Sequence, residues 1–332
     1  MARGRPTPAA AAGLGRYAAG RIVQALVVLW VTYTVVFAAV LALPSDPVTI
    51  YLSSDNSSDP ATIAELRAFY GYDRPWYEQY GAQLGHLVRG DVGFSLSSGQ
   101  PVLERIGGVM GSTVRLASTG LLFAVVLAVL VSAAAFLVGA PWLSRAVAAL
   151  PSLVSAVPVF WLGIVVLQVF SFQLGILPLF PDGSLVSLVV PALVLAVPVS
   201  APIAQVLLVA VQEAAHQPFV RTARAKGLRP VTVFTSHVLR SALPGAVAVI
   251  GTALGVLVAG SVITETVFGR PGLGSVLLRA VVAQDVPLVQ GLVLLTTAVV
   301  VVTALVLDLL APALDPRVVR SFGRRGVTRL AG

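Results

Sequence analysis

Long stretches without any charged residue constrain this chain more than any other feature of its sequence. An α-helix needs about 20 residues to cross a hydrocarbon core about 30 Å thick. Stretches of that length predict six membrane-spanning helices, at 22–45, 116–138, 146–170, 185–211, 245–263 and 286–307. Only 11% of the residues are charged, against roughly 25% in a soluble protein, which argues against an ordinary water-soluble enzyme.

Basic residues are distributed unevenly between the two sides that this topology creates. Placing both termini in the cytoplasm puts 15 basic and 3 acidic residues on the inner side, and 7 basic and 11 acidic residues on the outer side. Lys and Arg favour the cytoplasmic side in short loops. The predicted fold is an all-α membrane protein with about six transmembrane helices and cytoplasmic N- and C-termini. The formal net charge of +8 then reflects topology and not nucleic-acid binding.

The spans divide the chain into five parts. The first apolar stretch exceeds the run of about 7–15 residues found in a cleaved signal peptide, so we expect it to remain as an anchor. We predict a cytoplasmic N-terminal segment, a first transmembrane helix, an extracytoplasmic segment, a core of helices two to six and a basic cytoplasmic tail, at 1–21, 22–45, 46–115, 116–310 and 311–332.

The extracytoplasmic segment carries two amphipathic patterns. Asp59-Pro60 is a typical helix start. Apolar residues at helical spacing then form two stripes, Ile63, Leu66 and Tyr70, followed by Trp76, Tyr80, Leu84 and Leu87 before Gly90. They predict two short helices lying on the membrane surface or at the mouth of the bundle. A separately packed cap with no role in binding is the alternative.

The connection 212–244, between spans four and five, is polar and basic. Gly227 suits the left-handed turn that ends a helix, and Pro230 suits the first turn of the next. An apolar stripe at helical spacing follows, made of Val231, Phe234, Val238 and Ala242. We predict a helix, a glycine turn and a second helix, held near the membrane by one apolar face and presenting a basic surface to a soluble partner. A loop that only sets the topology is the alternative.

This connection resembles the EAA-type coupling loop of ATP-binding-cassette (ABC) importer permeases, and is closest to the branch that serves dipeptides, oligopeptides and nickel. The resemblance rests on Thr-Ala-Arg-Ala-Lys-Gly-Leu at 222–228 and on His-Val-Leu-Arg-Ser-Ala-Leu-Pro at 237–244. Further matches, in the order of the family, extend from about residue 16 to 317, at 73–75, 79–80, 90–93, 95, 260–268, 271–274, 285–291 and 314–317.

The resemblance implies a multi-pass permease of the plasma or inner membrane that pairs with a second permease, two cytoplasmic ATP-binding subunits and an extracytoplasmic solute-binding protein. The residues that it marks for coupling to the ATPase are Arg221, Thr222, Ala223, Arg224, Ala225, Lys226, Gly227, His237, Arg240 and Pro244. Peptides are the favoured substrate class, with nickel or another small solute as the alternative. ATP and Mg²⁺ are expected on the partner subunits, and no cofactor or metal on this chain.

The residues themselves bear on other functional classes. A phosphate-binding P-loop needs Lys followed by Ser or Thr, but the only lysine, Lys226, precedes Gly227, so we do not expect ATP hydrolysis by this chain. An ion-coupled secondary transporter, the alternative class, usually buries an ionisable residue within a span, and the six spans contain none. Cysteine is absent and the three histidines lie outside the spans, which disfavours an intramembrane hydrolase.

Four polar residues are candidates for the translocation pathway or its gate. Glu265 and Asp285 lie at the outer ends of spans, and Gln168 and Gln205 lie within spans. Each has a structural alternative, because a carboxylate at a helix end is often hydrated or paired, and a glutamine in a span can bond to a neighbouring helix. The sequence pattern does not choose between these interpretations.

Overall fold

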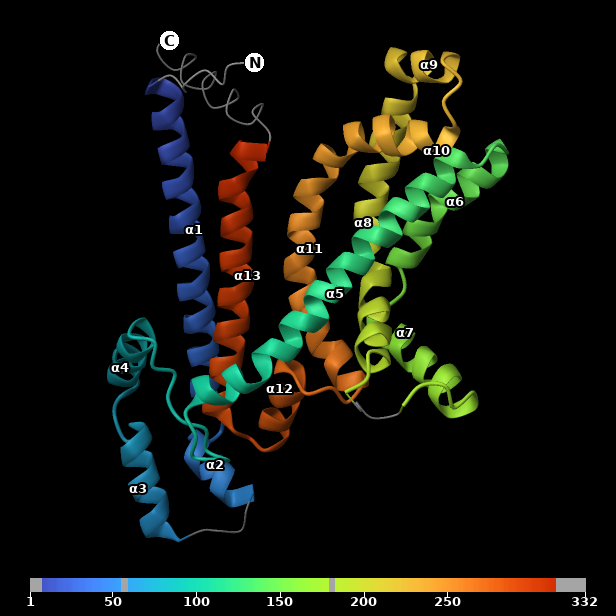
Figure 1. Cartoon of the computed structure of the whole chain (residues 1–332). Helices are drawn as coiled ribbons and strands as arrows, with labels where there is room; N and C mark the ends of the chain where they lie inside the picture. Colours follow the sequence, from blue (N-terminus) through green and yellow to red (C-terminus); the bar gives the residue numbers. More distant parts are fainter. Residues whose placement is uncertain (1–7, 55–58, 179–182, 315–332) are drawn as a thin grey trace.

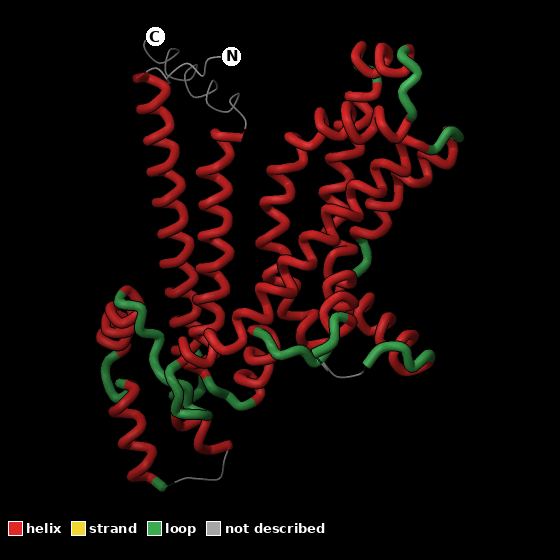
Figure 2. The backbone as a smooth tube through the Cα atoms, in the orientation of Figure 1, coloured by secondary structure: helices red, strands yellow, loops and turns green. Residues whose placement is uncertain are grey.

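The computed structural model describes residues 8–54, 59–178 and 183–314, which fold almost entirely into helices (Figures 1 and 2). Within these ranges, five helices are long and apolar enough to cross a membrane. They are α1 (Pro8–Leu41), α5 (Val102–Leu137), α8 (Val186–Ala215), the continuous helix α10–η2–α11 (Pro230–Val233, Phe234–Val238 and Leu239–Val267) and α13 (Val286–Leu314). The prediction of an all-α membrane protein is confirmed.

The predicted span at 146–170 is not one straight helix. The chain forms α6 (Pro141–Ser155) and α7 (Val159–Val166), which continues as the π-helix η1 (Leu167–Gln173), and the two halves are bent by 99°. The bend falls at 156–158, where Pro158 precedes α7 with an extended ψ of 135°. Proline disfavours helical geometry in the residue before it, which explains the break. If the bent pair counts as one span, the crossings number six.

Two helices have boundaries that differ from those of the predicted spans. The helix that contains the second predicted span begins at Val102 and not at 116, so about four turns of the predicted extracytoplasmic segment belong to α5. Pro244, the last residue of the predicted connection 212–244, lies inside α11. Proline is tolerated within membrane helices where neighbouring groups compensate for the lost hydrogen bond. Pro191, Pro198 and Pro202 likewise lie inside α8.

The segment between α1 and α5 contains three short helices, α2 (Pro47–Ser54), α3 (Pro60–Tyr70) and α4 (Trp76–Val88). The predicted cap of α3 is present, because the Asp59 carboxylate accepts a hydrogen bond from the amide of Ala61. Helix α4 packs on α1, where Tyr33 Oη donates to the carbonyl of Tyr80 at 2.8 Å. Trp76, predicted to share the apolar face of α4, is exposed.

The start of α1, the end of α13 and the short helix α9 (Pro218–Ala225) lie at one end of the bundle (Figure 1). We call it the α9 end. Helices α2, α3 and α4 lie at the opposite end, together with α12 (Leu273–Val282). Helix α5 runs obliquely from this second end towards the first. An even number of crossings follows from this arrangement.

Buried apolar residues form two separate clusters. The larger cluster joins α5, α8, α9, η2 and α11 and extends to the α9 end. The smaller cluster lies at the opposite end, where Val102 and Ile106 of α5 pack against residues of α12 and α13. The start of α5 therefore belongs to one cluster and its remainder to the other.

Helix α12 packs on α11 at a position that admits only glycine. A Cβ atom at Gly274 would overlap the backbone of Val262, and a backbone cannot move aside as the tip of a flexible side chain can. This close approach holds the start of α12 against the end of α11.

We therefore predict that Gly274→Ala destabilises the protein by about 1–3 kcal/mol, the usual cost of overpacking. Thermal unfolding in detergent or nanodiscs measures this change. Gly111→Ala is the matched control, because a Cβ there meets nothing within 4 Å. Equal melting temperatures for both variants would contradict the packing.

Candidate functional site

The segment that follows α8 forms the predicted helix, glycine turn and second helix. Pro218 begins α9, and Gly227 adopts a φ of +77°. The amide of Gly227 donates to the carbonyl of Arg224 at 2.9 Å, and the amide of Leu228 donates to the carbonyl of Ala223 at 3.3 Å. These bonds close the C-terminus of α9, and glycine adopts the positive φ without strain. Pro230 then begins α10.

One face of α9 is embedded in the larger apolar cluster. Val220 and Ala223 are buried there, beside Phe234 of η2. The ring of Phe136 in α5 lies 5.5 Å from that of Phe234, and the Arg224 guanidinium lies 5.6 Å from the centre of the Phe136 ring. Helix α9 thus shares one packed core with α5, α8 and α11, so these helices cannot move independently of it without breaking that core.

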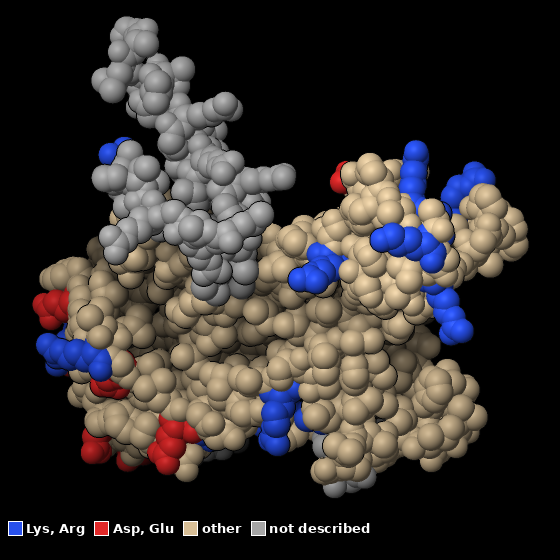
Figure 3. Space-filling view, turned by 45° about the horizontal axis from the view of Figure 1, so that its top comes forward, with Lys and Arg blue, Asp and Glu red and all other residues tan. Residues whose placement is uncertain are grey.

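The opposite face of the segment is exposed and basic. The six predicted coupling residues that are exposed in α9 and the turn after it are Arg221, Thr222, Arg224, Ala225, Lys226 and Gly227. Figure 3 shows most visible Lys and Arg side chains near this end of the molecule, whereas most visible Asp and Glu side chains lie near α3 and α4. Exposed apolar side chains, Phe219 and Leu228, adjoin the arginines. This combination of charge and apolar area is typical of a protein-binding surface.

Three of the four residues in the predicted apolar stripe of the second helix are buried, and the position of the fourth is shifted. Val231 is 57% exposed, and Val233 is buried in its place together with Phe234, Val238 and Ala242. The shift follows from the π-helix η2, in which the amide of Leu239 bonds to the carbonyl of Phe234, five residues earlier. A wider turn brings Val233 and Val238 onto the same face. The sequence pattern assumed an α-helix and missed this change.

The remaining predicted residues of this segment and of the spans are scattered. His237 is half-buried, whereas Arg240 and Pro244 are exposed along η2 and α11. Gln168 is exposed on η1. Gln205 is exposed on α8 and donates to Ser152 Oγ of α6 at 3.5 Å, the limit of hydrogen bonding. The structure does not bring the two glutamines together.

Glu265 is fully buried near the end of α11, where it joins three helices. Its Oε1 accepts a hydrogen bond from Thr113 Oγ1 of α5 at 2.6 Å, and its Oε2 accepts one from the amide of Gly274 in α12 at 2.8 Å. Thr113 Oγ1 in turn accepts from the amide of Leu273 at 3.0 Å. The carboxylate is therefore held by neutral donors from α5 and α12.

Asp285 is also fully buried, immediately before α13. Its Oδ1 accepts from the amides of Leu96 and Leu288, at 3.1 and 3.2 Å, and its Oδ2 accepts from both the amide and the hydroxyl of Ser97 at 3.0 and 2.7 Å and from Ser95 Oγ. Burial alone would raise the pKa of this carboxyl group, but the hydrogen bonds from Ser95, Ser97 and Leu96 outweigh it and hold the pKa below its ordinary value. Asp285 thus fastens the loop before α5 to the start of α13.

Sequence reasoning missed most partners of these two carboxylates. Thr113 carried no distinguishing pattern, since it lies within a long helix. Ser95 and the glycines around Glu265 were among the matches to the permease family, but that resemblance indicated no contact between them. Because Ser95, Leu96 and Ser97 are separated from Asp285 by about 190 residues, only the folded chain reveals the joint.

An apolar hollow of about 300 Å³ lies between α7, α8 and α11. Its lining residues include Val159, Pro198, Pro202 and Val256. One wall of this hollow is formed by α8, the helix that carries Gln205, and no ionisable side chain lines it. Across the described residues, no group of three His, Cys, Asp or Glu side chains is placed to hold a metal ion.

Comparison with known proteins identifies a matching family and two similar permeases. Residues 120–320 match the family described as "Binding-protein-dependent transport system inner membrane component". The chain is 31% identical over 306 residues to the glutathione transport system permease protein GsiC of Escherichia coli O6:H1, covering 91% of this chain and 98% of the relative. It is 32% identical over 310 residues to the di/tripeptide transport system permease protein DppB of Pseudomonas aeruginosa, covering 85% and 92%.

The joint at Asp285 predicts a pH dependence. Because its folded pKa lies below the unfolded value, the joint contributes stability above the unfolded pKa and loses it as the pH falls through the folded pKa. After correction for intrinsic rates, hydrogen exchange at the amides of Leu96 and Ser97 should accelerate in acid.

Asp285→Asn should show faster exchange at neutral pH already, corresponding to a loss of about 1.5–3 kcal/mol for hydrogen bonds to a charged group. Glu104→Gln, at an exposed position of α5, is the control. Exchange at residues 95–98 that is unchanged in Asp285→Asn would contradict this account.

Proposed function

The chain belongs to the family of binding-protein-dependent transport system inner membrane components, and we propose that it forms half of the translocation pathway of an ATP-driven peptide importer. It is a multi-pass protein of the inner (plasma) membrane and a permease component, not an ATPase. The hydrolysis of ATP, with its Mg²⁺, takes place on partner subunits. Both termini and α9 then lie in the cytoplasm, and α2–α4 lie outside.

One observation carries the coupling part of this proposal. Helix α9 is exposed and basic on one face and is packed on the other face into the core that contains α5, α8 and α11. A partner that moves α9 must therefore move these helices. We propose that the segment from Arg221 to Pro244 docks on a cytoplasmic ATPase, with the exposed residues of α9 and the following turn at the centre of the contact.

The proposed mechanism rests on the core that α9 shares with the long helices, because a tightly packed core has only a few alternative arrangements. Closure of the two ATPase subunits on ATP moves α9 as a rigid body, and the helices that share its core switch between inward- and outward-facing arrangements. The hollow between α7, α8 and α11 and the exposed Gln168 and Gln205 support a pathway along these helices. The buried Glu265 and Asp285 act in this proposal as joints of the outer end and not as substrate ligands.

The substrate class and the partners follow from the family and its relatives. The two relatives are named for transport of glutathione and of di- and tripeptides, so we propose peptides as the substrate, with nickel or another small solute as the alternative. The complex then contains a second, homologous permease, two ATP-binding subunits and an extracytoplasmic solute-binding protein. Co-purification in mild detergent identifies these subunits directly.

An uptake assay separates this proposal from ion-coupled transport. Cells or vesicles that import peptide should continue to do so with a protonophore present while ATP is maintained. Uptake that stops under these conditions would instead support a proton-coupled carrier.

Gly227→Val should uncouple the complex. A β-branched residue strongly disfavours a φ of +77°, so the turn after α9 should deform and alter the presented surface. We expect uptake and retention of the ATPase subunits to fall together by about tenfold or more, whereas membrane insertion persists. Gly245→Val is the control, because Gly245 lies in α11 with open space around it. Full transport by Gly227→Val would refute the docking proposal.

Leu228→Glu tests the contact surface without altering the turn. Leu228 is 39% exposed, so a carboxylate there stays hydrated in the free chain but is buried in the proposed ATPase contact, at the cost of desolvation. Binding of the ATPase subunits should weaken about tenfold with no change in melting temperature. Val88→Glu, on the outer helix α4, is the matched control and should bind normally. Equal binding by the two variants would exclude Leu228 from the contact.

A further inference from the structure

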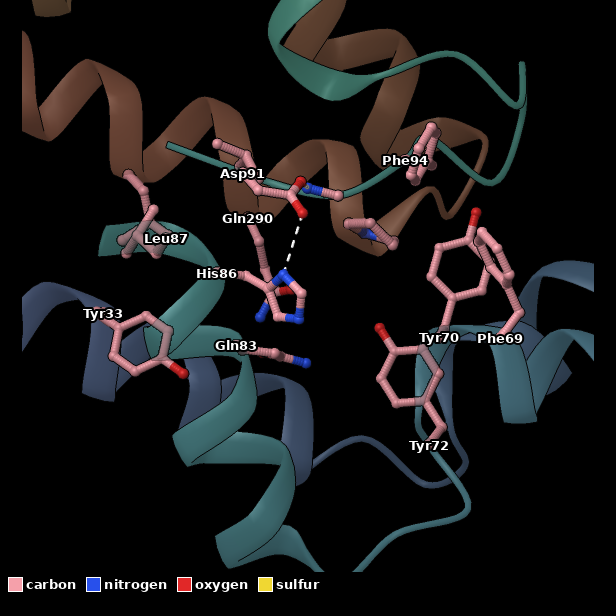
Figure 4. A pocket seen from close by; sticks show the side chains of 14 residues that line it. Tyr33, Phe69, Tyr70, Tyr72, Gln83, His86, Leu87, Asp91, Phe94 and Gln290 are labelled. Atoms are coloured by element: carbon pink, nitrogen blue, oxygen red, sulfur yellow. Dashed lines mark hydrogen bonds and ion pairs between the residues drawn. The ribbon is translucent and has the colours of Figure 1, made fainter. Parts of the chain in front are cut away.

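A second cavity lies beside α3 and α4, at the end of the bundle opposite the α9 end, and takes no part in the proposed mechanism. It is a half-open pocket of about 230 Å³ between α1, α3, α4, the loop at 91–94 and the first turns of α13. Figure 4 shows Gln83, His86 and Asp91 on one side and Tyr70 and Tyr72 on the other. One water occupies about 30 Å³ of liquid, so the cavity admits a small organic group and is much larger than a bare ion requires.

Asp91 is held in a fixed orientation at the wall of this cavity. Its Oδ1 accepts from the amide of Gly93 at 2.9 Å, and its Oδ2 lies 3.1 Å from His86 Nδ1. The Asp91 side chain nevertheless remains 53% exposed. Its carboxylate is therefore positioned by the protein while part of it stays available to a ligand.

Two carboxylates outside the cavity lining, those of Asp46 and Asp285, act on its tyrosines. Burial raises the pKa of the Tyr72 phenol, and Tyr70, Asp46 and Asp285 raise it further. Burial and then Asp285 likewise raise the pKa of Tyr70. The guanidinium nearest Asp46 belongs to Arg67, with its Nε at 3.4 Å, which leaves Asp285 and Asp91 without an arginine partner among the described residues. A ligand cation would meet a favourable potential here.

Aromatic rings supply the rest of the wall. Tyr33, Phe69, Tyr70, Tyr72 and Phe94 all line the cavity. Tyr70 and Tyr72 lie with ring centres 6.2 Å apart and nearly parallel, and Phe69 contacts Phe94 at 5.9 Å. Aromatic faces attract organic ammonium groups, as in the cages that bind choline and methyl-lysine. The cavity offers one aspartate and one histidine, too few for a metal centre built from protein ligands.

We propose that this cavity binds an organic ammonium group, with Asp91 as its counter-ion and Tyr70 and Tyr72 against its apolar part. The inference rests on the proposed function in one respect, because it takes the α-ammonium of a peptide's first residue as the ligand. The amine of a phospholipid headgroup has the same chemistry and is the other source. Gln83 and Gln290 provide amide groups for the remaining polar atoms of either ligand.

The test uses the complete permease–ATPase complex in nanodiscs of phosphatidylglycerol, without the solute-binding protein. Saturation-transfer NMR follows titration with dialanine and with N-acetyl-dialanine, which lacks the charge. The free amine should bind about tenfold more tightly than the acetylated peptide, as expected for a charge-assisted contact. Nanodiscs that contain phosphatidylethanolamine show whether the bound ammonium group comes from a peptide or from a lipid headgroup. Weaker dialanine binding in them assigns the cavity to the lipid amine, and unchanged binding assigns it to the peptide.

Three variants locate the site. Asp91→Asn keeps an oxygen that accepts from the Gly93 amide but removes the charge, so dialanine binding should fall about tenfold. Tyr72→Leu removes a ring while retaining apolar bulk, and should also weaken binding. Asp73→Asn, exposed and outside the cavity lining, should bind as the wild type does. Melting temperatures establish that each variant is folded.

Two results would overturn the inference. One is equal binding of the free and acetylated peptides by the wild-type complex. The other is binding by Asp91→Asn and Tyr72→Leu that equals binding by Asp73→Asn. If the wild-type importer still shows ATP-dependent uptake of peptides in the presence of its binding protein, either result rejects the cavity assignment alone. Absence of peptide uptake in the wild type would reject the proposed function instead.

Discussion

Three prolines inside α8 impose a constraint on which most of the structure depends. Each removes a backbone hydrogen bond, and within a membrane the freed carbonyl is tolerated only where other parts of the protein cover it. Helix α8 is accordingly the most enclosed of the long helices, and it packs against α5, α6, α7 and α11. Because α9 begins three residues after α8 ends, the exposed basic segment is attached directly to the centre of the bundle.

The two ends of the molecule are stabilised by different kinds of interaction. At the α9 end, apolar side chains and small residues make a continuous core, and the polar groups face outwards. At the opposite end, two buried carboxylates are satisfied by hydroxyl and amide donors on both sides of a smaller core. At Asp285, hydrogen bonds from neutral donors favour the charged carboxylate. Such a joint is directional, since its hydrogen bonds fix the angle between the segments that it connects.

The sequence was sufficient for features that depend on local chemistry. Uncharged runs located the crossings, Asp59 marked the start of α3, and Gly227 marked a turn whose φ is positive. Features that depend on contacts between distant parts of the chain could not be predicted from the sequence. Pro158 lies at the break of a span, whereas Pro198 and Pro202 lie inside α8. The residue type alone therefore does not decide whether a helix breaks or continues at a proline. The exposure of the arginines in α9 was predictable from their charge. One partner of Glu265, however, is Thr113, which lies 152 residues away, beyond any local pattern.

The length of α5 has a mechanical consequence. Thr113, at the carboxylate joint, and Phe136, beside Arg224 of α9, lie on one uninterrupted helix. At 1.5 Å per residue they are about 35 Å apart along its axis. A stiff rod of that length behaves as a lever. Tilting it by about 5° around its midpoint would displace the two residues by roughly 1.5 Å in opposite directions, so a shift beside α9 would be paired with an opposite shift at the carboxylate joint.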